Sequence, residues 1–170
     1  MTANLQPTLQ GELIELRPLR LDDWDALFAV ASDRLIWEQH PASDRYQEPV
    51  FREFFRVAME SHGAFAVIER ATGHVIGSSR YAGYDPAKRE LEIGWTFLAR
   101  SHWGGRYNGE MKRLMMQHAF QFVDRALFVI GRSNVRSRTA IERLGGVVLP
   151  DAGNGDEEKV VYAISAPCRT

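Results

Sequence analysis

A strand that passes through a glycine-rich turn into an amphipathic helix restricts the fold of this chain more than any other feature. In Glu90–Leu98 (ELEIGWTFL), apolar and polar side chains alternate strictly, which predicts a strand with positions 91, 93, 95 and 97 on one face. Leu98–Glu110 (LARSHWGGRYNGE) follows, and Asn108–Phe122 then places apolar side chains at helical spacing. This succession is typical of α/β and α+β domains.

The same periodicities assign the other elements. We expect further strands at 11–19, 64–69, 75–81, 126–130, 147–149 and 158–164, and further helices at 21–31, 48–62 and 134–144. Asp22 and Asn134 are expected to cap helices, while Gly63 and Gly145 are expected to end them. A turn is expected around Asn154-Gly155. With no repeat or linker in the sequence, residues 1–170 are expected to form one domain.

Composition excludes several classes of protein. The chain has 21 basic and 22 acidic residues among 170, a net charge of -1, which disfavours non-specific binding to nucleic acid or anionic lipid. Its single cysteine, Cys168, allows no internal disulfide and no cysteine-based metal site. Residues 1–12 lack the features of a signal peptide, and no apolar run approaches the roughly 20 residues of a membrane span. We therefore expect a cytoplasmic protein without a metal, a nucleic-acid partner or a membrane partner.

Two neighbouring stretches carry the candidate chemistry. Gly104-Gly105 precedes a helix, where free backbone N–H groups and the helix dipole favour an anion such as a phosphate, although steric reasons alone also place glycine in such turns. Arg106 occupies the middle glycine position of a dinucleotide fingerprint, and no Gly-Lys-Ser/Thr follows, so neither phosphate-binding motif is present. Gly131–Gly145 (GRSNVRSRTAIERLG) adds four arginines, which suit either a solvated helix face or a multiply charged anion.

The stretch TFLARSHWGGRYNGEMKRLMMQHAF, followed by NVRSRTAIERLGG, resembles the GNAT acyltransferase superfamily. It is most similar to the branch that contains the ribosomal-protein N-terminal acetyltransferases. The resemblance covers nearly the whole chain in element order and is specific in Glu92–Gly146. It implies a mixed, mostly antiparallel central sheet with helices on both faces, splayed at the Glu90–Leu98 strand.

The resemblance also implies roles for individual residues. The family's pyrophosphate loop, whose backbone N–H groups hold the CoA diphosphate, falls on Trp103, Gly104, Gly105, Arg106, Tyr107 and Asn108. The backbone of Phe97 and Leu98 would pair with the pantetheine arm, and Asn134 would bind the CoA arm from the facing strand–helix junction. Ser137 stands where members of this branch place a hydroxyl near the departing thiolate, and Glu92 matches the carboxylate often assigned as general base.

Glu92 also has a simpler interpretation, in which it meets solvent or pairs with an arginine on the polar face of its strand. A bulge at Gly94 would shift the alternation, splay the strand from its neighbour and open a cleft. A segment in the first half, Trp37–Pro41 with Arg45-Tyr46 behind it, falls where the family's variable substrate-binding helices lie. That segment suits either an amine pocket or ordinary packing.

The sequence departs from the family pattern at the general acid. The tyrosine that many members use is Ile141 here, so Ser137, Tyr162 or Tyr107 must serve if an acid is needed. In the loop, Arg106 replaces the usual second glycine, which indicates either a direct phosphate contact or a modified geometry.

The leading hypothesis is an acetyl-CoA-dependent N-acetyltransferase that modifies a primary amine, on a protein N-terminus or a small molecule, by direct transfer in a ternary complex. Arg106 and the missing tyrosine motivate an alternative, a non-catalytic acyl-CoA-binding or sensing module. A third hypothesis, RNA binding through Arg132–Arg143, is disfavoured by the net charge and by the acidic run Asp156–Glu158. A homodimer is compatible with the sequence, which does not determine the oligomeric state.

Overall fold

The computed structural model describes residues 2–150, 152 and 156–168, so the turn expected at Asn154-Gly155 lies outside the described residues. The strands are β1 (Leu9–Gln10), β2 (Ile14–Pro18), β3 (Ala64–Glu69), β4 (Val75–Asp85), β5 (Glu90–Leu98), β6 (Arg125–Gly131), β7 (Val147–Val148) and β8 (Lys159–Ser165). The α-helices are α1 (Trp24–Ala31), α2 (Glu48–Ser61), α3 (Arg106–Ala119) and α4 (Val135–Arg143). Short 3-10 turns are η1 (Leu21–Asp23), η2 (Arg34–Ile36) and η3 (Arg100–His102).

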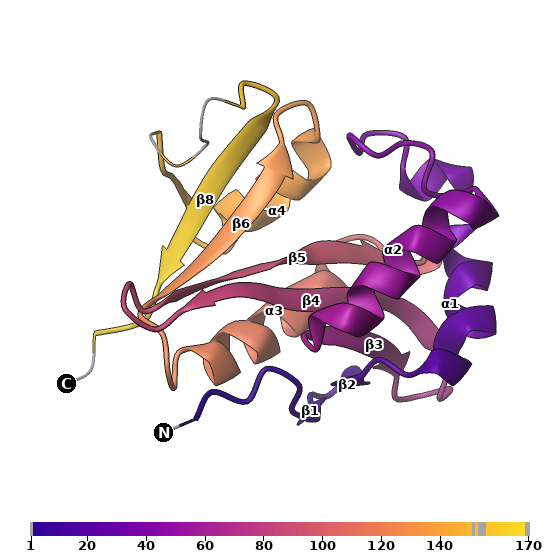
Figure 1. The fold of residues 1–170 in the computed structure, drawn as a ribbon, viewed down its shortest axis with the longest axis horizontal. Coiled ribbons are helices and arrows are strands. Elements are labelled where there is room, and N and C mark those ends of the chain that lie inside the picture. Colours follow the sequence, from indigo (N-terminus) through magenta and orange to yellow (C-terminus); the bar gives the residue numbers. More distant parts are fainter. Residues whose placement is uncertain (1, 151, 153–155, 169–170) are drawn as a thin grey trace.

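The described strands form one mixed sheet in the order β1-β2-β3-β4-β5-β6-β8-β7. Neighbouring strands are antiparallel except β5 and β6, which are parallel and share only three register positions. The last of these pairs Glu92 with Leu127, after which β6 and β8 turn away from β5 (Figure 1). The expected mixed, mostly antiparallel sheet, splayed at the 90–98 strand, is confirmed.

A bulge in β5 reverses which of its side chains face which side of the sheet. Arg80 of β4 pairs with Gly94, but Ser78 pairs with Phe97, so β5 carries one extra residue between these positions. Trp95 has φ of 52°, in the left-handed region. The predicted strict alternation is therefore wrong beyond Gly94, because the bulge turns the following side chains to the opposite face.

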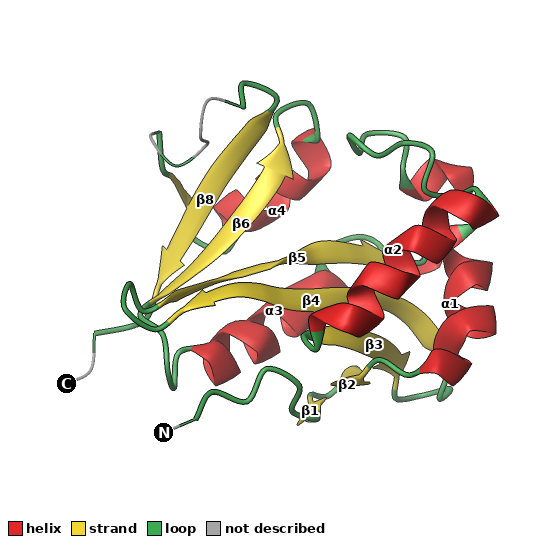
Figure 2. Cartoon of the chain, viewed as in Figure 1, coloured by secondary structure: helices red, strands yellow, loops and turns green. Residues whose placement is uncertain are grey.

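Helices cover both faces of the sheet and enclose two hydrophobic cores (Figure 2). Leu91 and Ile93 of β5 pack with α3 in the first core, while Phe97, beyond the bulge, packs with α1 and α2 in the second. The first core also includes Ile14, Phe65, Tyr81, Met111, Met115 and Phe128, and the second includes Leu27, Trp37, Phe51, Phe54 and Phe55. Reversal at the bulge thus lets β5 contribute to both cores.

Two of the expected helix ends differ in the structure. Asp23, rather than Asp22, accepts the backbone N–H of Arg20 at 2.8 Å and pairs with Arg17 at 2.6 Å, because the chain enters α1 through η1. After α2, His62 adopts the left-handed conformation predicted for Gly63, with φ of 52°. Glycine is needed at 63 for another reason, since a Cβ there would lie 2.2 Å from a β4 carbonyl oxygen.

The N-terminal edge of the sheet is held by one buried carboxylate from α3. Glu110 accepts the backbone N–H groups of Glu12, Leu13 and Ile14, each at 2.9 Å. These bonds join segments almost one hundred residues apart in the chain. Across the described ranges, no helix is long and apolar enough to span a membrane.

Candidate active site

The turn between β5 and α3 leaves a row of backbone N–H groups without acceptors. Gly104 and Gly105 have φ of 115° and 95°, a conformation that favours glycine, and this directs the chain into α3. The first bond within the helix runs from the N–H of Gly109 to the carbonyl of Gly105 at 2.8 Å. No atom in the part of the chain that the structure describes accepts the backbone N–H groups of residues 104–108. We call residues 104–108 the anion cradle, because its N–H groups and the α3 dipole both favour negative charge.

The space beside the cradle suits a diphosphate. A Cβ added at Gly104 or Gly105 would meet no atom within 4 Å. Arg106 is exposed at the start of α3 and adds a positive charge. These observations fit the diphosphate of CoA, which the family resemblance implies for this loop.

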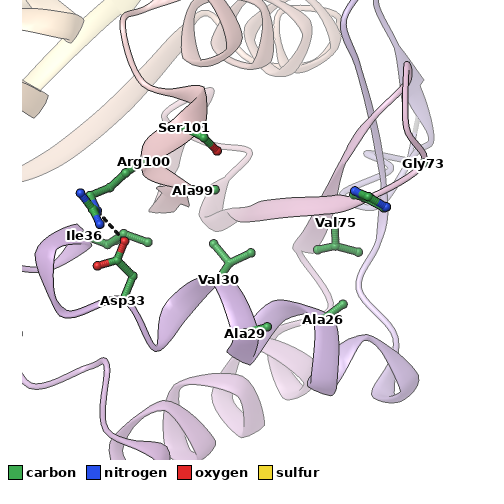
Figure 3. A pocket seen from close by; sticks show the side chains of 11 residues that line it. Ala26, Ala29, Val30, Asp33, Ile36, Gly73, Val75, Ala99, Arg100 and Ser101 are labelled. Atoms are coloured by element: carbon green, nitrogen blue, oxygen red, sulfur yellow. Dashed lines mark hydrogen bonds and ion pairs between the residues drawn. The ribbon is translucent and has the colours of Figure 1, made fainter.

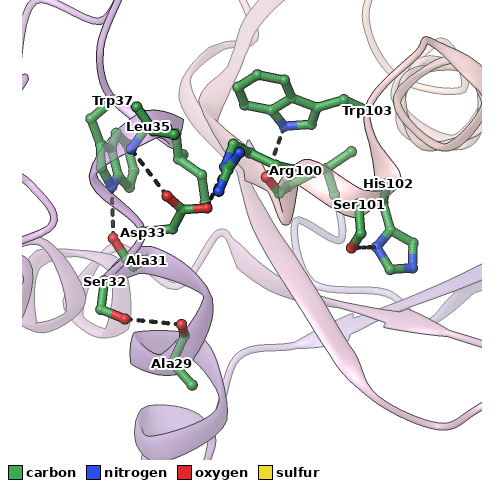
Figure 4. Close-up of polar contacts among 12 residues, drawn as sticks. Ala29, Ala31, Ser32, Asp33, Leu35, Trp37, Arg100, Ser101, His102 and Trp103 are labelled. Carbon is green, nitrogen blue, oxygen red and sulfur yellow. Dashed lines mark hydrogen bonds and ion pairs between the residues drawn. The ribbon is translucent and has the colours of Figure 1, made fainter.

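The end of β5 faces the cradle through Leu98. The N–H of Ala99 donates to the Ile76 carbonyl of β4, so the Leu98 carbonyl points to the opposite edge of the strand. There it accepts the indole N–H of Trp103 at 2.9 Å (Figure 4). The side chain of Phe97 is buried in the second core. Phe97 and Leu98 are the two residues predicted to pair with the pantetheine arm. The Leu98 carbonyl points to the edge of β5 that β6 leaves unpaired, and there it already accepts the Trp103 indole N–H.

Asn134 begins α4 as predicted. Its Oδ1 accepts the N–H of Ser137 at 3.3 Å, which confirms the expected cap. Asn134 is buried, and its Nδ2 group donates to no described residue. The Ser137 hydroxyl, in the first turn of α4, has no hydrogen bond within the described ranges either. Both side chains thus keep polar groups for a ligand.

Three arginines of residues 131–145 contact different parts of the structure. Arg132 donates to a backbone carbonyl just before β8, and Arg138 donates to a tyrosine hydroxyl of β8. Arg136 instead places its guanidinium carbon 3.6 Å from the centroid of the Trp103 ring and donates to the Ile36 carbonyl at 3.4 Å. Of these three, Arg136 alone contacts the loop that precedes the cradle.

Glu92 lies at the point where β5 and β6 part. It is half-buried, and its carboxylate makes no hydrogen bond with a described residue. Burial raises the pKa of Glu92 above its ordinary value, and the charges of Lys159 and Arg80 oppose that rise. A carboxylate with a raised pKa is a stronger base than an exposed one.

Both tyrosines considered as general acids have other partners. The Tyr162 hydroxyl donates to Glu142 at 2.6 Å and accepts from Arg138 at 3.0 Å. The Tyr107 hydroxyl donates to Glu69 at 3.1 Å, on β3. Ser137 is therefore the candidate acid whose hydroxyl is left without a partner among the described residues.

The sequence pattern does not predict the burial of one lysine, which lies between β5 and β6. The Nζ of Lys112, on α3, donates to the Thr96 hydroxyl of β5 at 2.7 Å and lies 5.5 Å from the Phe128 ring centroid of β6. Lys112 therefore occupies space between the two strands after they part. Burial lowers its pKa from 10.5 to about 7. Its place among polar positions of an amphipathic helix predicted solvent exposure, and only the sheet geometry shows otherwise.

The segment before α2 packs aromatic side chains against the second core. Trp37 is buried, donates its indole N–H to the Ala31 carbonyl at 2.8 Å and packs against Phe97 (Figure 4). The rings of Trp37 and His40 meet edge to face, and the guanidinium of Arg45 lies 5.3 Å from the Trp37 ring centroid. Of the two interpretations of this segment, packing is observed for Trp37, and an amine pocket stays a prediction.

A separate hollow of about 930 Å³ lies between α1 and η3, and Glu92 does not line it. Small apolar side chains of α1 line one wall and η3 lines the other, with Arg100 and Asp33 paired at one end (Figure 3). None of the predicted site residues lines it. Among the described residues, no group of three histidine, cysteine, aspartate or glutamate side chains is placed to hold a metal ion.

Comparison with known proteins identifies the family. The sequence profile of a family described as "Acetyltransferase (GNAT) domain" matches residues 14–147. A GCN5-related N-acetyltransferase from Brucella melitensis is 25% identical and has a TM-score of 0.76, with 94% of this chain and 79% of that chain covered. An acetyltransferase from Agrobacterium tumefaciens is 26% identical with a TM-score of 0.72, covering 94% and 95%. A ribosomal-protein-serine acetyltransferase-like protein from Vibrio cholerae, 15% identical with a TM-score of 0.72 and coverage of 98% and 100%, shares the fold.

The family profile matches most of the chain, so the chain belongs to the GNAT acetyltransferase family. It is an acyltransferase, and the resemblance seen in its sequence is confirmed. Members of this family generally use acetyl-CoA and act on amines.

Proposed function

We propose that this acyltransferase transfers an acetyl group from acetyl-CoA to a primary amine, in a ternary complex and without a covalent enzyme intermediate. The observation that carries the proposal is the position of Glu92 relative to the anion cradle. Glu92 is the last residue of β5 paired with β6, and the cradle follows the other end of the same strand. The unpaired edge of β5 between them provides a path from a phosphate site to a base.

The cradle would hold the diphosphate of CoA, with the Asn134 Nδ2 group and the open edge of β5 as further contacts. This co-substrate supplies the activated acetyl group as a thioester. Five backbone N–H groups that bond to no described acceptor suit an anion, and exposed Arg106 adds charge to the same site. The fit therefore depends chiefly on backbone groups.

Glu92 would remove a proton from the amine substrate. An unperturbed alkyl amine has a pKa of about 10, so it is protonated near neutral pH and must lose a proton before it attacks. Burial raises the pKa of Glu92, which makes its carboxylate a stronger base than an exposed glutamate. The unpaired edge of β5 offers backbone groups to the oxygen that becomes negative.

Departure of the thiolate needs little help, because a thiolate is a good leaving group. Ser137 would supply a hydroxyl at this step, since its Oγ has no partner among the described residues while those of Tyr107 and Tyr162 do. The absence of a tyrosine at 141 is then compatible with catalysis.

Release of free thiol from acetyl-CoA with a panel of amines tests this proposal. Glu92→Gln should lower kcat/KM by about 10²–10⁴-fold, the usual contribution of a general base. It should also abolish the rise of kcat/KM with pH that follows ionisation of Glu92. Glu90→Gln is the matched control, because Glu90 lies on the same strand but pairs with Arg125 at 2.6 Å. Full turnover of Glu92→Gln at every pH would refute the assignment.

One observation favours the alternative, a non-catalytic acyl-CoA-binding or sensing module. The hydroxyls of both Tyr107 and Tyr162 are hydrogen-bonded to glutamates, so neither is free to act as the family's acid. Binding of CoA measured by calorimetry, with no thiol release for any amine, would support this alternative.

A further inference from the structure

Two arginines near Glu92 form no ion pair with a described residue. Arg80 of β4 is only 4% exposed, and its Nε is buried without a hydrogen-bond partner among the described residues. Arg45, in the loop before α2, is half-buried and forms no ion pair within the described ranges. A buried charge without a counterion is costly, so the position of Arg80 requires an explanation.

The two guanidinium groups share an aromatic neighbour. Both lie against the Phe54 ring, with the Arg45 carbon at 4.7 Å and the Arg80 carbon at 5.4 Å from its centroid. Since both distances are to one centroid, the two carbons are at most about 10 Å apart. Arg80 also lies 4.6 Å from the Trp95 centroid and Arg45 lies 5.3 Å from that of Trp37. Cation–π contacts offset part of the cost, but they leave the N–H donors of the guanidinium forks unused.

Burial and neighbouring charges both act on the pKa values of this cluster, and the charge of Glu92 opposes the lowering at Arg80. Burial, followed by the charge of Arg45, lowers the pKa of Arg80 to about 10. Burial, followed by the charges of Arg45 and Arg136, lowers the pKa of His40 to about 4, so this imidazole is neutral near pH 7. Its Nδ1 accepts the backbone N–H of Ala42 at 2.9 Å, which leaves the proton on Nε2. These groups thus offer donors to an anion. Glu92 is the carboxylate whose charge acts on Arg80, but the two side chains form no ion pair within the described ranges.

Glu92 is a close neighbour of this cluster. Arg80 pairs with Gly94 and Ala82 pairs with Glu92, which makes Arg80 and Glu92 diagonal neighbours on one face of the sheet. Diagonal positions in an antiparallel pair are about 7–8 Å apart. A group bound by Arg80 and a group facing Glu92 are therefore separated by only a few bonds.

We propose that the amine substrate is a small amino-acid-like molecule whose carboxylate is bound by Arg80 and Arg45 while its amine faces Glu92. This inference rests on the proposed role of Glu92 as the base. The planar guanidinium fork matches a carboxylate in two parallel hydrogen bonds, and burial strengthens such bonds. An amine and a carboxylate a few bonds apart, as in α-, β- or γ-amino acids, fit the spacing of the two sites.

Matched substrates test the proposal. Each amino acid is compared with its primary amide and its decarboxylated amine, which keep the amine and lose the negative charge. A lost charged hydrogen bond is worth about 1.5–3 kcal/mol, so kcat/KM for the acid should exceed that for the amide by roughly 10–150-fold. Peptides whose first residue is neutral are tested as well. A kcat/KM for these peptides or for the amides that equals or exceeds that for the amino acids would overturn the proposal.

Variants of Arg45 and Arg80 test whether these two side chains cause the preference for the acid over the amide. Arg45→Met should reduce the acid-to-amide ratio at least tenfold and leave the KM for acetyl-CoA unchanged, and Arg80→Lys keeps the buried charge while losing the fork. Arg52→Met is the matched control, because Arg52 also lies over an aromatic ring, 4.6 Å from the Trp24 centroid, but pairs with Glu48. An unchanged ratio in both Arg45→Met and Arg80→Lys would refute the assignment.

A binding measurement separates this inference from the proposed function. N-acetylated amino acids carry the carboxylate but no reactive amine, so calorimetry reports on the arginine site without catalysis. Binding that depends on Arg45 and Arg80, with no acetyl transfer to any amine, would support the carboxylate site and contradict the proposed function. Acetylation of neutral amines without binding of N-acetylated amino acids would support the function and refute the carboxylate site.

Discussion

The buried lysine of α3 gives a prediction that can be worked out from its surroundings. Lys112 is 5% exposed, and its Nζ contacts the Thr96 hydroxyl and the Phe128 ring, with no carboxylate in contact among the described residues. Burial lowers its pKa from 10.5 to about 7. The folded protein therefore binds this proton more weakly than the unfolded chain does.

The sign and size of the effect follow from proton linkage. Between pH 7 and 10.5 the unfolded chain binds more protons at this lysine, so the free energy of unfolding rises with pH. The full difference corresponds to about 5 kcal/mol at 1.36 kcal/mol per pKa unit, and about 2 kcal/mol of it is recovered between pH 7 and pH 9. Lys112→Met removes the titrating group, so it removes this gain.

Urea denaturation of both proteins at pH 6, 7, 8 and 9 measures the effect. The free energy of unfolding of wild type, minus that of Lys112→Met, should increase by about 2 kcal/mol from pH 7 to pH 9. At any single pH, the difference in unfolding free energy between the two proteins also includes changes in packing and the lost hydrogen bond to Thr96. The change of that difference with pH is therefore the quantity that reports on Lys112. Lys88→Met is the control, because Lys88 is exposed. If the wild-type and Lys112→Met curves stay parallel, Lys112 does not titrate as its burial requires.

Two further predictions address the cradle and the entry into α1. Gly104→Val places a β-branched side chain at φ of 115° and should weaken CoA binding at least tenfold by calorimetry. Gly83→Val, at another left-handed glycine near the end of β4, should not; equal affinities would contradict the cradle assignment. Asp23→Asn should lower the free energy of unfolding by about 2–3 kcal/mol at pH 7, because the side chain is buried and pairs with Arg17. Although burial acts to raise the pKa of Asp23, its hydrogen bonds with Arg17 and Arg20 lower it overall, so this stabilisation is present above about pH 4. The difference in unfolding free energy should shrink as pH falls further, and a constant difference down to pH 2 would refute it.

Local signals predicted the elements and the cradle. Gly104-Gly105 was found because the turn and helix start are neighbours in sequence, and Asn134 was found because a cap precedes its helix directly. The sequence suggests a bulge at Gly94, where glycine would allow an unusual backbone conformation. In the structure the left-handed residue is Trp95, a bulky residue for which that conformation is rare. Tertiary contacts of Trp95 with Arg80 outweigh the local preference, and local propensity contains no such information.

The residues that sequence reasoning missed depend on register and burial. Lys112 and Arg80 are long charged residues of the kind that solvent usually covers. Their burial follows from the separation of β5 and β6 and from the pairing of β4 with β5 across the bulge. Neither feature is encoded within a short window of the sequence.

The order of strands in the sheet also bears on how the chain assembles. From β1 to β6, each strand pairs with the strand just before it in the sequence, so each can join an edge that already exists as the chain is made. The exception is β7, which does not pair with the preceding β6, because β8 lies between them and leaves β7 at the outer edge. The N-terminal edge nevertheless stays incomplete until α3 is synthesised, because the three N–H groups at residues 12–14 need the Glu110 carboxylate. The N-terminal segment is therefore synthesised first, but its hydrogen bonds are complete only after α3 has been made.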